Sequence, residues 1–116
     1  MNKTIETIER ILKEIAEPSV VDGIEYQLVM DTERNHYQIN AVGWQDLKRV
    51  HGILVQIDIK DGLIWVQEDN TEYRVAEELV KSGIPKDKIV LGFHAPYKRP
   101  YTGYATGETL TQVTQV

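Results

Sequence analysis

Side chains that could carry out chemistry are few in this chain and lie far apart in the sequence. The histidines are His36, His51 and His94, and none of them shows the His-x-x-x-His spacing that sets two metal ligands on one helix face. The serines, Ser19 and Ser82, lie outside any Gly-x-Ser-x-Gly motif, and the glycines are scattered rather than gathered in a phosphate-binding loop. The sequence therefore predicts no catalytic residue, no metal site and no cofactor.

Asp58 is the carboxylate with the most distinctive surroundings, because the hairpin described below places it opposite Trp65. An acid held against an aromatic ring can work in proton transfer if the pair is buried. The alternative is a polar sheet face whose tryptophan rests on a helix or on a neighbouring subunit. One carboxylate without a partner is a weak catalytic signal, so we favour the second interpretation and predict a protein that is not an enzyme. A small hydrolase remains an alternative.

Residues 97–104 combine cations with aromatic rings near the C-terminal end. Stacking and phosphate contacts of this kind suit single-stranded nucleic acid, which makes Tyr97, Lys98, Arg99 and Tyr101 candidate nucleic-acid contacts. The whole chain, however, has 13 Lys+Arg against 18 Asp+Glu and a net charge of −5. Because DNA affinity comes mainly from neutralised phosphates, direct nucleic-acid binding is kept as an alternative function, and a surface loop that packs its tyrosines along the sheet is the other interpretation.

A sheet must position these residues, and residues 49–70 predict its central hairpin. Asp61-Gly62 separates two β-rich runs and favours a type I′ turn, in which both central residues have positive φ. This turn would place Val55 opposite Glu68. One face of the hairpin is then apolar and predicts the core: Ile53, Val55, Ile57, Ile59, Ile64 and Val66. The opposite face is mostly polar: Leu54, Gln56, Asp58, Lys60, Trp65 and Gln67.

The remaining segments predict a single α+β domain. Apolar residues at helical spacing over 2–17 indicate an amphipathic helix that ends at Pro18. Residues 24–30 and 36–44 alternate as strands, and their short connections favour an antiparallel meander of about four strands with the hairpin. Residues 71–82 predict a helix after the meander, capped by Asn70 or Thr71. Residues 89–93 are short and apolar, as in a fifth strand or a buried extended segment.

Composition bounds the class of protein. A chain of 116 residues suits one domain with one core. The chain contains no cysteine, which excludes disulfides and thiolate zinc sites. No apolar run is long enough to span a membrane, and the N-terminal segment lacks the apolar core of a signal peptide. We expect a cytoplasmic protein with no membrane contact.

A series of short motifs, taken in order, resembles the XisI family. The motifs cover nearly the whole chain: DTER (31–34), HYQ (36–38), VGW (42–44), RVHG (49–52), IDIKDG (57–62), IWVQ (64–67), TE (71–72), AEELV (76–80), GIPK (83–86), IVLGFH (89–94) and residues 99–105. Gln56 departs from the pattern, because a histidine is expected before Ile-Asp-Ile-Lys. The resemblance implies an XisI-like domain over residues 1–105, followed by a Thr/Gln-rich tail over residues 106–116.

The function that the resemblance implies is accessory. XisI proteins of cyanobacteria are linked to control of the excision of the fdxN element, and they act with a recombinase and with XisH, a nuclease-like second factor. For this chain it implies a non-enzymatic regulatory factor in DNA recombination that acts through contacts with an XisH-like protein or a site-specific recombinase. A homodimer is a further expectation. The resemblance carries over no catalytic residue.

The polar hairpin face provides a candidate surface for such contacts. Tryptophan and arginine are enriched in the energetic centres of protein interfaces, and an acidic surface suits a basic, DNA-binding partner. We therefore hypothesise that one face meets either a second copy of the chain or a DNA-processing partner. Its residues are Gln56, Asp58, Trp65 and Gln67, with Arg34 and Arg99 at the rim.

Overall fold

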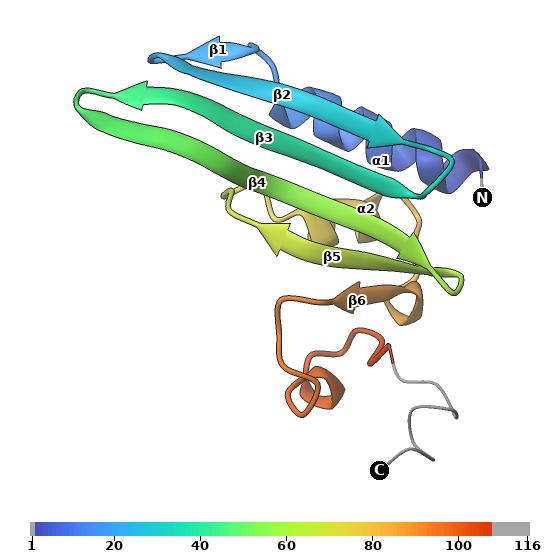
Figure 1. Ribbon diagram of the computed structural model, residues 1–116. Helices are drawn as coiled ribbons and strands as arrows, with labels where there is room; N and C mark the ends of the chain where they lie inside the picture. Colours follow the sequence, from blue (N-terminus) through green and yellow to red (C-terminus); the bar gives the residue numbers. More distant parts are fainter. Residues whose placement is uncertain (1, 108–116) are drawn as a thin grey trace.

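The computed structural model describes residues 2–107, which form one sheet with two helices on the same face (Figure 1). The sheet has six strands, and their order in space is their order in the chain. The strands are β1 (Val20–Val21), β2 (Ile24–Asp31), β3 (His36–Gln45), β4 (Lys48–Lys60), β5 (Leu63–Asp69) and β6 (Ile89–Leu91). The α+β fold and the meander of β2 to β5 are confirmed, and β1 and β6 bring the strand count above the predicted four or five.

Strand β6 is parallel to β5, which makes the sheet mixed. The chain leaves β5, passes through helix α2 (Val75–Lys81) and the short 3₁₀ turn η1 (Lys86–Lys88), and returns in the original direction. A crossover through a helix is the usual way to join parallel strands. The apolar segment 89–93 therefore contains the predicted extra strand, and a second 3₁₀ turn, η2 (Arg99–Tyr101), follows it.

The core lies between the sheet and helices α1 (Asn2–Ile15) and α2, which are both behind the strands in Figure 1. Side chains from all layers are fully buried there, including Ile11 of α1, Tyr37 and Ile57 of the sheet and Leu79 of α2. The apolar stripe of the N-terminal segment is thus confirmed as a packing face. No helix among the described residues is long and apolar enough to cross a membrane.

The predicted central turn is present. Asp61 and Gly62 have φ of 54° and 76°, and Lys60 pairs with Leu63 across them. Asp58 pairs with Trp65 and Ile57 with Val66, as the sequence predicted. The register of the hairpin near its turn therefore follows from the Asp-Gly pair alone.

Two irregularities overturn the prediction farther from the turn. Between β3 and β4 the register shifts, so that Ile39 faces Val55 but Asn40 faces Ile53. Leu54 is the extra residue and packs against the core, while Ile53 lies on the other face with 36% of its surface exposed. The prediction of Ile53 as a core residue was wrong, because a bulge exchanges the two faces of a strand.

The second irregularity lies between β4 and β5. Gln67 is the extra residue there, since Ile57 pairs with Val66 while Gln56 pairs with Glu68. Val55 consequently pairs with Asp69 and not with Glu68, and the predicted pairing was wrong. Alternation of apolar and polar residues does not reveal such an inserted residue.

Helix α2 begins at Val75, four residues after the predicted start, and neither Asn70 nor Thr71 caps it. Residues 71–74 form an irregular turn in which Arg74 has φ of 59°. Asp69 organises this turn: one carboxylate oxygen accepts a hydrogen bond from the Thr71 amide at 3.1 Å, and the other accepts from the Val75 amide at 2.9 Å. An aspartate at the end of β5 therefore satisfies the helix N-terminus.

Replacing Asp69 should reveal this role. Asp69→Ala is expected to cost about 1–2 kcal/mol of stability, the usual loss when a capping side chain is removed. Asp69→Asn retains one acceptor and should lose less. Urea denaturation of the three proteins measures the difference, and an unchanged midpoint for Asp69→Ala would show that the turn is held by other contacts.

Candidate interaction face around Asp58

The sheet face opposite the helices carries a hydrogen-bonded cluster centred on Asp58. Strand pairing sets His36 of β3 beside Asp58 of β4. The Nδ1 atom of His36 lies 2.8 Å from Oδ1 of Asp58, and the Gln56 side-chain amide donates to the same oxygen at 3.2 Å. The Gln67 amide donates to Oδ2 at 3.1 Å. Three of the predicted face residues, Gln56, Asp58 and Gln67, are thus brought together.

His36 is the cluster member that the sequence reasoning missed. Its side chain is 54% exposed, whereas that of Asp58 is only 14% exposed. The signal was available in part, because His36 begins a predicted strand next to the strand of Asp58. Only the exact pairing of β3 with β4 shows that the two residues are opposite each other.

The Asp58 carboxylate is largely occupied by its neighbours. The oxygens of Asp58 are already engaged by three neighbours, which leaves little of the carboxylate to act as a base. Within residues 2–107, no three His, Asp or Glu side chains come close enough to hold a metal ion. His36 is the member of the cluster most exposed to solvent.

Trp65 lies beside the cluster but under residues of its own chain. The Lys60 ammonium is 5.3 Å from the centre of its ring, and the Arg99 guanidinium is 5.1 Å away. A Cβ added to Gly107 would come within 2.5 Å of the ring, so the backbone of Gly107 lies directly against it. The indole Nε1 is buried without a hydrogen-bond partner among the described residues. The segment after β6 therefore covers much of the tryptophan.

Arg99 lies over Trp65 of the candidate face and also holds that segment in place. Its guanidinium donates to the carbonyl oxygens of His94 at 3.0 Å, Gly92 at 3.4 Å and Thr106 at 3.5 Å. Because one planar guanidinium binds three backbone carbonyls, it holds the segment after β6 in a folded-back path over Trp65. The other rim residue, Arg34, lies in the turn between β2 and β3 and pairs with Asp31 at 3.1 Å.

The residues proposed to contact nucleic acid are divided by the structure. Tyr97 and Tyr101 are 73% and 90% exposed, and the Lys98 ammonium lies 5.9 Å from the centre of the Tyr97 ring. Arg99, in contrast, points inward to the carbonyls. The expected tail boundary after residue 105 falls within this region, where Ala105 bridges to Val90 and Gly107 touches Trp65. Residues 108–116 of that tail lie outside the described part of the chain.

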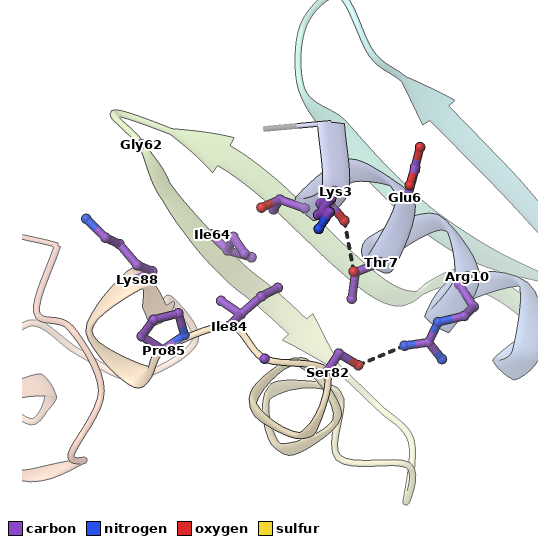
Figure 2. Close-up of a pocket in the computed structure, with 12 residues that line it drawn as sticks. Lys3, Glu6, Thr7, Arg10, Gly62, Ile64, Ser82, Ile84, Pro85 and Lys88 are labelled. Carbon is purple, nitrogen blue, oxygen red and sulfur yellow. Dashed lines mark hydrogen bonds between the residues drawn. The ribbon is translucent and has the colours of Figure 1, made fainter.

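A cleft of about 610 Å³ lies elsewhere, between α1 and the segment that follows α2 (Figure 2). Ile64 and Ile84 contribute apolar walls, and Lys3 and Lys88 contribute positive charge. Figure 2 shows the Arg10 guanidinium bonded to the Ser82 hydroxyl across the cleft, at 2.7 Å. None of the residues predicted from the sequence as site residues lines it.

Comparison with known proteins gives the family. The family model for the XisI protein matches residues 1–106. A crystal structure of an XisI-like protein from Anabaena variabilis is 49% identical and superposes with a TM-score of 0.82, covering 89% of this chain and 95% of that one. A structure of the fdxN element excision controlling factor XisI from the same organism is 35% identical, with a TM-score of 0.77 and the same coverage. No curated protein sequence matches. This chain therefore belongs to the XisI family.

Proposed function

We propose that this chain is a non-enzymatic factor that controls the excision of a DNA element. The observation that carries the proposal is its 35% identity, over 89% of the chain, to a protein named as the fdxN element excision controlling factor XisI. The candidate face agrees with a regulatory role, because its carboxylate is occupied by hydrogen bonds within the face itself.

The proposed mode of action is contact with another protein. An XisH-like nuclease or a site-specific recombinase must bind DNA and therefore carries basic surface. The net charge of −5 on this chain is complementary to such a surface and would speed the encounter. The cluster of His36, Gln56, Asp58 and Gln67 offers a fixed set of polar groups, which costs little ordering when a partner binds. Arg34 lies in the turn just before His36 and extends this surface.

Direct contact with nucleic acid is the second candidate function. The observation in its favour is the exposure of Tyr97 and Tyr101, because exposed aromatic rings can stack on bases, and Lys98 lies beside the Tyr97 ring. Arg99 adds nothing to such a site, since its guanidinium is bonded to backbone carbonyls. Loss of excision on changing both tyrosines to serine, with partner binding intact, would favour this candidate.

A reconstituted excision assay tests the proposal. Purified recombinase, an XisH-like protein and a plasmid carrying the element should yield excision only when this chain is added. The chain alone should leave the plasmid intact in Mg²⁺. His36→Ala should weaken partner capture about tenfold, equivalent to about 1.4 kcal/mol, without lowering the melting temperature.

His51→Ala is the matched control, because His51 is an exposed histidine farther along the same sheet. Equal losses for the two variants would show that the cluster is not the contact surface.

Cleavage of DNA by the chain alone, abolished by Asp58→Ala, would establish the hydrolase alternative instead. Excision that proceeds equally without the chain would refute a controlling role.

A further inference from the structure

Strand β2 presents an unpaired edge. Strand β1 pairs only with Ile24 and Glu25, and the Tyr26 amide donates to the Ser19 carbonyl at 2.8 Å. Beyond Tyr26, residues 27–31 pair with β3 on the inner side, and no strand of the described chain pairs on the outer side. Alternate residues of a strand direct their N–H and C=O to the same side. Leu28 and Met30 therefore direct these groups outward, as Tyr26 does.

The edge lacks the usual features that prevent strand pairing. Natural sheet edges are protected by charged residues, proline, bulges or covering segments. Residues 26–30 read Tyr-Gln-Leu-Val-Met, without a charge or a proline, and their pairing with β3 runs without a bulge. Leu28 is 40% exposed and Val29 is 43% exposed, one on each face of the sheet. Apolar surface thus flanks the open backbone groups on both sides.

We infer that this edge binds the same edge of a second copy of the chain, in antiparallel orientation. The open stretch of residues 27–31 has Val29 at its centre. A twofold axis through Val29 therefore pairs every residue of this stretch with a residue of the same stretch in the second copy. Leu28 then bonds to Met30 of the second copy, and Gln27 lies opposite Asp31. An axis through Leu28 would instead place Glu25 opposite Asp31, and these two like charges would repel each other. Glu25 is also already paired with β1 and is not available to a second copy.

Helix α1 supplies charges that suit a second copy. Arg10 and Glu14 face the α2 side, where the Arg10 guanidinium bonds the Ser82 hydroxyl and Glu14 accepts from the Tyr73 hydroxyl at 2.6 Å. Glu9 directly precedes Arg10, and Lys13 directly precedes Glu14. Successive side chains of an α-helix differ in direction by about 100° around the helix axis. The buried residues Ile8, Ile11 and Leu12 mark the core side of the helix. With that reference, Glu9 and Lys13 fall on the flank away from α2, toward β2.

Glu9 and Lys13 have no ion-pair partner within residues 2–107. The twofold axis makes the two copies of α1 antiparallel, which brings Glu9 of one beside Lys13 of the other, twice. A surface that is complementary to itself in this way fits a twofold dimer rather than an unrelated protein.

Sedimentation equilibrium of the full chain tests the inference. Wild type should have twice the 13.3 kDa mass of one chain. Val29→Lys and Leu28→Pro should both give single chains with unchanged circular dichroism. The proline removes an outward N–H and leaves the ladder to β3 intact. Phe93→Lys, at a site that is 51% exposed and far from β2 in the sheet order, should remain dimeric.

A charge exchange tests the helix contact. Glu9→Lys and Lys13→Glu should each weaken the dimer at least tenfold, and the double variant should restore it. The inference is overturned if wild type is a single chain at all concentrations up to millimolar. It is equally overturned if the dimer survives Val29→Lys, or if Phe93→Lys disrupts it as strongly.

Discussion

Ile57→Asp should unfold this protein, whereas Ile53→Asp, four residues earlier in the same strand, should leave it folded. Ile57 is fully buried between the sheet and the helices, so the substitution places an unpaired charge in the core. Such a change costs about 5 kcal/mol or more, which is comparable with the whole stability of a small domain. Ile53 lies beyond the bulge at Leu54 and is 36% exposed, so its loss should stay within about 1 kcal/mol.

Circular dichroism and thermal melting of both variants provide the measurement. The alternation of residues 53–59 treats the two isoleucines as equivalent, and only the bulge separates them. A folded Ile57→Asp protein would show that the register of β4 is wrong. Unfolding of both variants would show that Ile53 belongs to the core and that the bulge is misplaced.

Trp65→Ala should free the segment that follows β6 from the sheet. The ring lies against Gly107 and beneath the Arg99 guanidinium, so its removal leaves a cavity at the base of the segment. Truncation of a fully buried aromatic residue costs about 3–5 kcal/mol. Trp65 is only half-buried, and the segment can detach locally, so the loss of stability should be smaller. Hydrogen exchange should rise over residues 92–107 while β2, β3 and β4 stay protected.

Trp44→Ala is the matched control, because Trp44 is 55% exposed near the end of β3 and stacks only with Arg49 among the described residues. It should change stability little. The hypothesis that Trp65 contacts a partner makes a different prediction for the same variant: association weakens by about 2–4 kcal/mol while residues 92–107 keep their protection. Exchange and binding measured together therefore decide which role Trp65 has.

Local patterns along the chain predicted the elements of this fold well. Helical spacing of isoleucines identified α1, and alternation identified the strands of the meander. Asp61-Gly62 determined the hairpin turn, because a tight turn with positive φ at both positions depends on two adjacent residues only. The pairing of Asp58 with Trp65 followed directly from that turn. The order of motifs along the chain also indicated the XisI family, and the match over residues 1–106 confirms it.

The class of the fold, the family and the contents of most of the core could all be predicted from the amino-acid sequence, since they depend on periodicity and motifs within single segments. Other features emerge only when the chain is folded: the bulges at Leu54 and Gln67, the start of α2 at Val75 with Asp69 bonded to its first amide, the pairing of His36 with Asp58, and the cover over Trp65. Each of these depends on hydrogen bonds or packing between different elements of the fold. Their geometry is set by the whole sheet, and no local pattern of residues records it.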